Sequence, residues 1–387
     1  MNMYHPRIIT SLSEISEQDW NSCCFNDITC HNPFLSHQFL SALENSGSAT
    51  AETGWLAQHI TLWKDKEIVG IMPLYLKNHS HGEYVFDHAW ANALHNTGGQ
   101  YYPKLQSSIP FTPVTGAKLL VRPGEENQPD IQKNLLTAAL SLTKTLGVSS
   151  LHVTFAEKEE WELMAECGFL KRLDQQFHWL NEGYRSFEDF LTALSSRKRK
   201  NIRKERKQAL INDIEIEHLS GKDITEDHWD HYFSFYLDTS NRKWGQAYLN
   251  REFFSLLSEK LSDRILLIMC KRNNKYIAGA MNLISDDTLY GRYWGAIEDH
   301  RYLHFEVCYY QAIDYAIKHG LKKVEAGAQG DHKLARGYLP TSTHSAHWIT
   351  NPSFRDAIAN FLTHEREAIL QNKEVLTSFA PFKKRDI

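Results

Sequence analysis

The order of predicted elements in the second half of the chain constrains its fold most. Three apolar runs separated by short polar turns are typical of consecutive antiparallel strands. The runs cover residues 265–270, 277–284 and 288–297. Apolar side chains then recur at helical spacing over 304–320, Gly320 stands where a helix C-terminus is expected, and a short strand follows at 321–327. This order predicts a mixed sheet with one crossover helix.

The first half repeats this order more loosely. Strands are predicted on either side of the turn Asp65-Lys66, followed by a helix over 130–147 and a strand over 150–155. Because 387 residues exceed one ordinary core at roughly 150 residues per domain, two similar units in tandem account for the length. The predicted fold class is α/β (α+β), in which each unit is a mixed, largely antiparallel sheet flanked by helices.

A basic helical segment is predicted between the two units. It begins with Ser186 followed by Asp189, which is the pattern of a helix N-cap, and lysine and arginine dominate the residues that follow. We therefore place an N-terminal domain at 1–185, a connecting segment at 186–213 and a C-terminal domain at 214–387.

Composition excludes several classes of protein. The chain is 42% hydrophobic and 23% charged, as in packed globular proteins, and no window approaches the run of about 20 apolar residues that a membrane span requires. Six scattered cysteines and an N-terminus unlike a signal peptide predict a cytoplasmic protein without a membrane span. Because the net charge is -4, any site for anions must be local.

The basic run at 195–208 is one candidate for such a local site. Arg199, Arg203 and Arg206 can align on one face of a helix, and arginine forks match phosphate oxygens bidentately. The functional interpretation is a clamp for a phosphate-bearing acceptor. A solvated helix face explains the same run, and the pattern alone favours that simpler interpretation.

The polar stretch from Glu325 to Tyr338 is the second candidate. Three glycines stand among charged and polar side chains directly after a predicted strand, and strand ends in α/β sheets are favoured binding positions. The charged and polar side chains after Glu325 are Gln329, Asp331, His332, Lys333 and Arg336. A solvated loop with glycines at positive φ is the alternative.

A third candidate lies in the predicted strand at 288–297. Tyr290 and Arg292 alternate with their neighbours, so both side chains point to the same face of the sheet. An arginine that points inward is costly unless it is paired, and Glu306 and Glu325 are natural partners. A structural ion pair and a substrate contact fit this pattern equally well.

Two further groups of residues leave alternatives open. Aromatic and proline-rich loops at 87–96, 98–106 and 109–116 either shape a pocket or pack on themselves. His344 and His347 have a spacing that zinc sometimes uses, but no second motif stands at a matching distance, so no metal is predicted. The sequence has no nucleophile elbow, Walker loop or Rossmann glycine motif, and no tightly bound cofactor is predicted.

Several segments resemble the FemAB-like family of peptidoglycan biosynthesis/recognition proteins, within the GNAT-like superfamily of acyl and aminoacyl transferases. They are NPFLSHQFLSALENSG, TGW, DHAWANA, GGQYYPKLQSSIPFTPVTG, DTLYGRYWG, LHFEVCYYQAIDYAI, EAGAQGDHKLARGYLP and HSAHW. The resemblance covers nearly the whole chain. It implies two GNAT-like units in tandem and transfer of an acyl or aminoacyl group.

The resemblance extends to residues of two segments. In the Fem ligases a segment like S-x-K-T-R-Y-N-I-R contributes to binding the diphosphate of a nucleotide-linked cell-wall precursor. Ser196 to Arg203 is similar to it and matches at Arg199, Asn201, Ile202 and Arg203. A later segment like Y-K-F-K-K-G-F is similar to 332–338 and matches at Lys333, Arg336, Gly337 and Tyr338. By this resemblance Lys333 would lie at the reacting acyl group.

One departure from the superfamily concerns the acyl donor. GNAT enzymes that use acetyl-CoA usually carry a Q/R-x-x-G-x-G/A loop for the pyrophosphate, whereas this chain has EDHRYLHFEV at that place. The departure argues against acyl-CoA. An aminoacyl-tRNA or another activated acyl group stays open as the donor.

We hypothesise direct attack of an acceptor amine on an activated acyl or aminoacyl ester. Such a reaction requires a base for the amine proton and cations for the tetrahedral oxyanion. Lys333 and Arg336 would stabilise the negative charge. Glu306 or Asp331 would accept the proton, with His332 in reserve.

The remaining candidates would bind substrate. Arg199 and Arg203 would hold acceptor phosphates, and the pocket would be formed by Tyr290, Arg292, Glu325 and Gln329. The main alternative is a non-catalytic module that binds a peptidoglycan precursor or RNA through the same cationic cleft. A metal enzyme that uses His344 and His347 is a weaker alternative.

Overall fold

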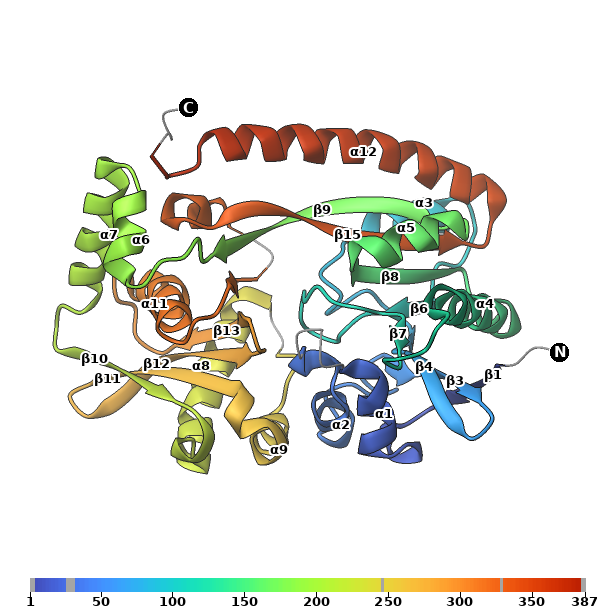
Figure 1. Cartoon of the computed structure of the whole chain (residues 1–387), viewed down its shortest axis with the longest axis horizontal. Helices are drawn as coiled ribbons and strands as arrows, with labels where there is room; N and C mark the ends of the chain where they lie inside the picture. Colours follow the sequence, from blue (N-terminus) through green and yellow to red (C-terminus); the bar gives the residue numbers. More distant parts are fainter. Residues whose placement is uncertain (1–3, 26–31, 245–246, 328–329, 384–387) are drawn as a thin grey trace. The chain divides into compact units, whose positions relative to one another are not determined.

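The computed structural model of the chain describes residues 4–25, 32–244, 247–327 and 330–383 (Figure 1). The chain divides into two compact units, and each is assembled from two stretches of sequence. Unit 1 comprises Met1–Gln175 with Ser342–Gln371, and unit 2 comprises Gln176–Thr341 with Asn372–Ile387. Strands β9 (Leu170–Leu180) and β15 (Leu339–Ile349) and helix α12 (Pro352–Ser378) each pass from one unit into the other.

These units differ from the predicted domains 1–185, 186–213 and 214–387. The stretch 342–371 returns to unit 1 because β15 pairs with a strand of that unit, β8 (Ser150–Ala156). The stretch 186–213 is part of unit 2, where the side chains of Phe190 and Leu194 are buried in the core.

Unit 1 contains two groups of strands. The first is a four-stranded sheet in the order β1-β3-β4-β7. Its strands are His5–Ile9, His59–Lys64, Glu67–Met72 and Leu120–Val121. The second group has the order β15-β8-β6-β5-β2, in which β6 and β8 are parallel. Its shorter strands are β2 (Trp55–Ala57), β5 (Tyr75–Lys77) and β6 (Lys104–Ser107).

Helices pack around these strands and form the core of unit 1. They are α1 (Glu17–Cys24), α2 (His37–Asn45), α3 (His88–Asn96), α4 (Gln128–Leu146) and α5 (Lys158–Glu166). The prediction of a helix at 130–147 is confirmed by α4, which ends at Gly147 with φ 63°, a backbone angle that glycine adopts without strain. Apolar residues of α4 such as Ile131 and Leu135 are buried against β3 and β4.

Unit 2 has the strand order β10-β11-β12-β13-β14-β9. The strands before β9 in this order are Ile214–Leu219, Ile265–Arg272, Lys275–Ile284, Thr288–Ala296 and Lys323–Glu325. Among the described residues of unit 2, β13 and β14 are the one pair of strands that is parallel, so the three predicted antiparallel strands and the crossover to a fourth are confirmed. Helices α8 (Glu226–Trp244) and α9 (Arg251–Leu261) belong to the same unit.

The crossover helix of unit 2 is less regular than the sequence predicts. It consists of α10 (Leu303–Phe305), a π-helical turn at Glu306–Tyr310 and α11 (Gln311–Lys318). A π-helical turn widens the helix by one residue and occurs frequently at functional sites. Here it buries Glu306, Tyr309 and Tyr310.

The predicted basic helical segment is two helices, α6 (Phe187–Ala193) and α7 (Ser196–Ala209). The break falls at Leu194, whose φ and ψ are extended and which pairs with Phe382 from the end of the chain. The predicted N-cap is confirmed, because the Ser186 side chain accepts a hydrogen bond from the backbone N–H of Asp189. Among the described residues, no helix combines the length and the apolar character needed to cross a membrane.

Candidate functional site

A small cavity in unit 2 lies beside β13 and the π-helical turn. Its volume is about 90 Å³. The register of β12 and β13 shifts at Met281 and Asn282, and β13 pairs with β14 only from Thr288 to Tyr290, so the strands separate beyond that point. We call this space the Arg292 cavity, and it is lined by Ala280, Met281, Asn282, Gly291, Arg292, Tyr293, Trp294, His304, Cys308, Tyr309 and Ala326.

Arg292 and Glu325 form a buried ion pair at this cavity. A terminal nitrogen of Arg292 donates to Glu325 Oε2 over 3.0 Å, and Lys323 Nζ lies 2.9 Å from the other carboxylate oxygen. Burial alone would raise the pKa of Glu325, but the charges of His178, Lys323 and Arg292 outweigh it and lower that pKa to about 2. Glu325 is therefore a fixed anion that orients Arg292.

Lys333 is the second buried cation near this cavity. It lies in a 3-10 helix at Asp331–Arg336, is 2% exposed, and donates from Nζ to the carbonyl oxygen of Gly327 over 2.9 Å. Burial, followed by the positive charge of Arg292, lowers the pKa of Lys333 to about 8. Lys333 does not itself line the Arg292 cavity, but its Nζ binds the carbonyl oxygen of Gly327, the residue after the cavity-lining Ala326, and its charge acts on Arg292. Two buried cations next to one cavity are an arrangement that can stabilise a developing anion.

Arg336 lies in the same 3-10 helix but is engaged elsewhere. Its NH2 nitrogen donates to both carboxylate oxygens of Glu205 on α7, at 3.0 and 2.9 Å, and its guanidinium lies 3.5 Å from the centre of the Phe305 ring. Its other terminal nitrogen donates to the carbonyl oxygen of His332. In this structure Arg336 holds the 3-10 helix against α7, and it is not among the residues that line the Arg292 cavity.

Tyr309 connects the cavity to His332. Tyr309 lines the cavity from the π-helical turn, and its hydroxyl lies 2.8 Å from Nε2 of His332. The His332 side chain is exposed, so a proton that left the cavity through the Tyr309 hydroxyl could pass to solvent. The contact between Tyr309 and His332 could not be predicted from the sequence. The pattern of apolar residues at 304–320 does not indicate that the Tyr309 side chain points towards 331–336.

The predicted bases have different surroundings. Glu306 is fully buried and accepts hydrogen bonds from Arg206 at 3.0–3.2 Å and from Gln311 at 2.7 Å, and burial raises its pKa. It does not line the Arg292 cavity. The side chain of Asp331 and the residue Gln329 lie outside the described part of the chain, so their predicted roles stay predictions. Tyr290 is buried next to Arg292, with its ring 5.1 Å from the guanidinium carbon.

The arginines predicted to bind phosphate do not converge on one point. Arg203 forms an exposed ion pair with Glu188 on α6, and Arg206 is bound to Glu306. Arg199 is half-buried, and within the described residues it has no carboxylate partner. None of the three lines the Arg292 cavity, so their role in holding an acceptor stays a prediction.

A second cavity of about 200 Å³ adjoins the first, because Trp294 and His304 line both. Its wall includes Glu298, Asp299, His300, Leu303 and His304, which belong to the segment EDHRYLHFEV of the sequence. Glu298 in that wall accepts two hydrogen bonds from Arg272 and one from His300, and these bonds lower its pKa to about 2. An anion is thus fixed in the wall of the second cavity.

The model of the FemAB-like family, described as peptidoglycan biosynthesis/recognition, matches residues 11–384. The chain belongs to the FemAB-like family. Among curated proteins, no sequence matches this FemAB-like chain.

Solved structures share the fold of this FemAB-like protein at low identity. FemX has a TM-score of 0.54 at 12% identity, over 89% of this chain and 98% of its own. The C-terminal domain of a putative lysylphosphatidylglycerol synthetase from Agrobacterium fabrum has a TM-score of 0.54 at 9% identity, over 92% and 97%. L-PGS from Bacillus licheniformis has a TM-score of 0.50 at 9% identity, over 84% and 96%. The predicted α/β (α+β) fold, with mixed sheets flanked by helices, is confirmed.

Unit 1 of this FemAB-like chain carries a buried polar cluster that the sequence interpretation missed. Successive residues of a strand point to opposite faces of a sheet. The register places Leu76, Leu105 and Leu151 on the face that packs in the apolar core. The opposite face carries a run of polar and aromatic residues at the paired positions, namely Tyr75, Lys77, Lys104, Gln106, His152 and His347.

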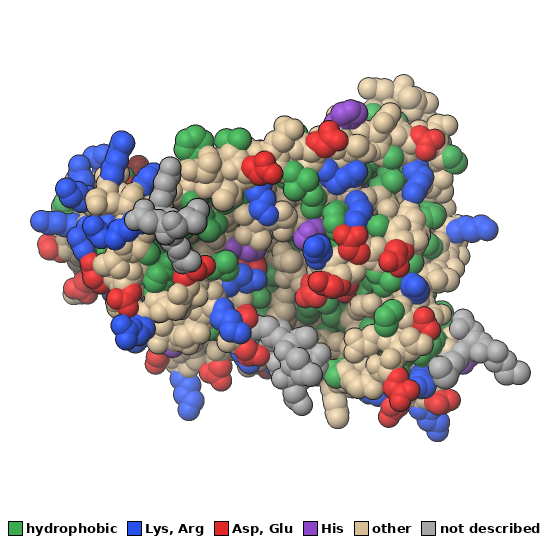
Figure 2. All heavy atoms as spheres, turned by 45° about the horizontal axis from the view of Figure 1, so that its top comes forward, with side chains coloured by type: hydrophobic (Ala, Val, Ile, Leu, Met, Phe, Trp, Pro, Cys, Tyr) green, Lys and Arg blue, Asp and Glu red, His purple; other side chains and the backbone are tan. Residues whose placement is uncertain are grey.

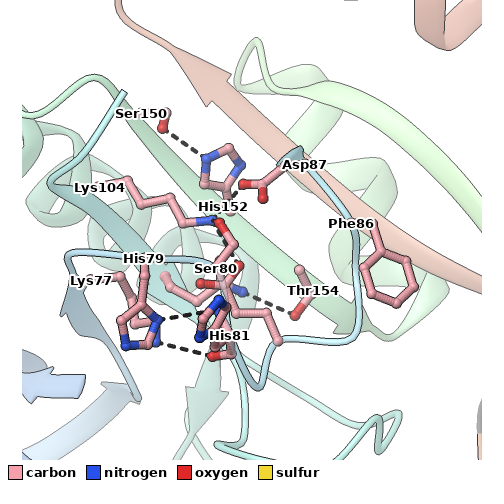
Figure 3. A network of polar contacts seen from close by, with 12 residues as sticks. Lys77, His79, Ser80, His81, Phe86, Asp87, Lys104, Ser150, His152 and Thr154 are labelled. Carbon is pink, nitrogen blue, oxygen red and sulfur yellow. Dashed lines mark hydrogen bonds and ion pairs between the residues drawn. The ribbon is translucent and has the colours of Figure 1, made fainter. Parts of the chain in front are cut away.

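Lys104 is the centre of this cluster (Figure 3). It is fully buried, and its Nζ lies 2.5 Å from Asp87 Oδ2, 2.7 Å from Glu83 Oε2 and 2.9 Å from Ser80 Oγ. Burial opposes the charge of Lys104, but the two carboxylates more than compensate and raise its pKa. The carboxylates come from the connection between β5 and β6, which covers this face of the sheet.

Hydrogen bonds extend the cluster from Asp87 to two buried histidines. The Tyr101 hydroxyl donates to Asp87 Oδ2 at 2.7 Å and lies 3.2 Å from His152 Nε2, and His152 Nδ1 lies 2.7 Å from His347 Nδ1. Burial lowers the pKa of His152 to about 3 and that of His347 well below its ordinary value. Both rings are therefore neutral. The Nδ1 atom of His347 is engaged in the contact with His152. Among the described residues, no group of three or more His, Cys, Asp and Glu side chains is placed to hold a metal ion.

Proposed function

We propose that this FemAB-like protein transfers an activated acyl or aminoacyl group to an acceptor amine, and that the reaction takes place at the Arg292 cavity. The observation that carries the proposal is a pair of buried cations: Arg292 lines the cavity, and Lys333 binds the carbonyl oxygen next to the cavity-lining Ala326 and is close enough for its charge to act on Arg292. Buried cations that are not both neutralised by carboxylates are costly, and sites that stabilise a developing negative charge have this arrangement. Lys333 donates only to a carbonyl oxygen among the bonds described.

In the proposed reaction the amine nitrogen attacks the acyl carbon and the new C–N bond forms. The electron pair of the carbonyl moves to its oxygen, and Lys333 and Arg292 stabilise the resulting negative charge. The bond from carbon to the leaving group then breaks, and the leaving group departs with that electron pair. A lysine with a pKa near 8 is mostly protonated at neutral pH, so Lys333 can also supply the proton that the leaving group takes up.

The amine must lose one proton during the attack. Tyr309 reaches the cavity and its hydroxyl lies against His332, so the Tyr309–His332 pair is our candidate route for that proton. This route replaces Glu306 as the preferred base, because both carboxylate oxygens of Glu306 are bonded to Arg206 and it lies off the cavity wall.

An aminoacyl ester such as aminoacyl-tRNA is the donor that we favour over acyl-CoA. The fixed anion Glu298 and its neighbour Asp299 line the second cavity, at the place where a CoA pyrophosphate would bind in a GNAT enzyme. The family description, peptidoglycan biosynthesis/recognition, supports a peptidoglycan precursor as the acceptor.

A binding module without catalysis is the second candidate. Three charged residues that could take part in chemistry are held in ion pairs within unit 2: Arg206 is paired with Glu306, and Arg336 is paired with Glu205. That arrangement favours a preformed site that recognises a precursor. The same family description includes recognition.

To test the proposal, the full-length protein is incubated with one acceptor and, separately, with each of two donors. The acceptor is a nucleotide-linked muramyl peptide with a free amine, and the donors are total tRNA charged with labelled amino acids and labelled acetyl-CoA. Mass spectrometry of the acceptor should show an added aminoacyl mass with wild type and with the exposed-lysine control Lys260→Ala, and none with Lys333→Ala. An acceptor that binds tightly but gains no mass with either donor would establish the binding module instead.

A further inference from the structure

Helix α7 carries a stripe of cations on its outer side. Arg197, Lys200, Lys204 and Lys207 are all exposed. At about 100° per residue they fall within an arc of roughly 80°, and they extend over about 15 Å of helix. Within the described residues, none of the four has a carboxylate partner. We call these four side chains the α7 stripe.

Three of the other charged residues of α7 are paired within unit 2. Arg203 is paired with Glu188, Arg206 with Glu306, and Glu205 with Arg336. The α7 stripe is therefore a local positive surface on a chain whose net charge is -4. Figure 2 shows Lys and Arg side chains gathered at the left, where Figure 1 places α6 and α7.

Exposed apolar side chains stand at both ends of the α7 stripe. Leu210 and Ile211 directly follow the helix, and Ile211 is 53% exposed. At the other end, the backbone N–H of Ser195 donates to the carbonyl oxygen of Pro381, so the end of α12 lies beside the start of α7. Phe379 in that stretch is 68% exposed, the largest value among the exposed large apolar residues.

We propose that the α7 stripe and these flanking apolar residues dock the protein on the surface of an anionic lipid bilayer. Lysine and arginine bind the negative surface of such a bilayer, each strengthening binding roughly fivefold. Apolar side chains next to them enter the boundary between head groups and acyl chains. A phosphate backbone of RNA would use the cations but would give no role to aliphatic side chains such as Leu210 and Ile211. The proposal does not depend on the chemistry at the Arg292 cavity.

The first part of the test measures sedimentation of the full chain with vesicles. We expect binding to vesicles of phosphatidylcholine with about a third phosphatidylglycerol, weakening as salt rises, and no binding to pure phosphatidylcholine. Changing the four stripe residues to Gln should weaken binding at least thirtyfold. The matched control changes four other exposed lysines to Gln, which alters net charge equally and should leave binding within about twofold; they are Lys66, Lys133, Lys158 and Lys222.

The second part separates a bilayer from RNA. The variant Leu210→Ser, Ile211→Ser, Phe379→Ser should bind anionic vesicles about tenfold more weakly, because its apolar contribution is lost. Its binding to a single-stranded RNA, measured by fluorescence anisotropy, serves as the comparison. Absence of wild-type binding to the anionic vesicles would overturn the proposal. So would vesicle binding unchanged by the serine variant combined with stripe-dependent RNA binding, which would identify a nucleic-acid surface.

Discussion

The guanidinium of Arg292 donates to Glu325 Oε2 over 3.0 Å, and both side chains are 1% exposed. Glu325→Gln removes the anion but keeps the shape, so Arg292, Lys323 and His178 lose their common counter-charge. We expect the free energy of unfolding to fall by about 3–5 kcal/mol, as when one partner of a buried ion pair is removed. Urea unfolding followed by circular dichroism measures this difference.

The control for that variant is Asp286→Asn, which breaks an exposed ion pair with Arg264. Such pairs are worth about 0–1 kcal/mol. Equal effects of the two substitutions would contradict the view that Glu325 is the fixed charge of the site.

Lys104 and Lys77 offer a matched comparison in unit 1, since both are fully buried and are paired in the register of β5 and β6. Lys104→Met leaves Glu83 and Asp87 buried without their cation, and we expect a loss of about 3–5 kcal/mol in the free energy of unfolding. Within the part of the chain that the structure describes, Lys77 donates to the carbonyl oxygen of His81 and to no carboxylate, and its Nζ lies over the Trp55 ring.

Burial lowers the pKa of Lys77 to about 7, so much of its charge is already lost near neutral pH. We therefore expect Lys77→Met to cost less than half as much as Lys104→Met. Thermal unfolding of the two variants side by side measures the order, and the reverse order would contradict the account of the cluster.

The buried pair His152 and His347 predicts a pH-dependent contribution to stability. Both pKa values lie below the ordinary 6.5, so between about pH 6.5 and pH 4 the unfolded chain binds protons that the folded chain does not. Their contribution is complete above pH 6.5 and is lost as pH falls, by up to about 1.4 kcal/mol per pH unit for each histidine. Glu83 and Glu160, whose pKa values are raised to about 7 by burial, act in the opposite direction.

The test therefore compares how steeply the stability of each protein changes with pH. His347→Asn keeps an amide where the ring nitrogen contacts His152 and removes one titrating group. Urea midpoints between pH 7.5 and 5 should fall less steeply for this variant than for wild type. His364→Asn, at an exposed position of α12, should keep the wild-type slope, and identical slopes for all three proteins would refute the assignment.

Gly295 and Gly291 on β13 should differ in how well they tolerate substitution by alanine. A Cβ at Gly295 would lie 2.3 Å from the backbone of Phe235 in α8, whereas one at Gly291 would lie 3.3 Å from the Asn282 side chain. We expect Gly295→Ala to lower the free energy of unfolding by about 1–3 kcal/mol or more and Gly291→Ala by less. Differential scanning calorimetry measures the melting temperatures of the two variants. Equal values would show that α8 moves to accommodate the added methyl group at little cost in free energy.

Local patterns were sufficient to predict much of unit 2. Apolar runs and polar turns at 265–297 indicate β11 to β13, because each strand pairs with the next along the chain. The return of β15 to pair with β8 has no such local signal, since the partners lie far apart in sequence. The predicted boundary at 185 and the assignment of 342–371 to the second domain differ from the structure for this reason.

The site was predictable only in part, because many of its contacts join residues that lie far apart in the sequence and leave no local signal. Glu325 as partner of Arg292 followed from the cost of an unpaired inward arginine. The Tyr309–His332 contact depends on the π-helical turn, and the Lys104 cluster depends on which strands pair. Alternation in the segments around Lys77, Lys104 and His152 was visible in the sequence, but it indicates a buried polar face only once these strands are neighbours.

The rate of acyl transfer by Lys333→Met in a single turnover, with donor and acceptor saturating, tests the central claim most directly. Removal of one charge donor from an oxyanion site lowers the rate by about a hundredfold to a thousandfold. We predict a loss in that range for Lys333→Met, with unchanged acceptor affinity and partial recovery in Lys333→Arg. A Lys333→Met protein that is folded, binds both substrates and transfers at the wild-type rate would contradict the proposed site.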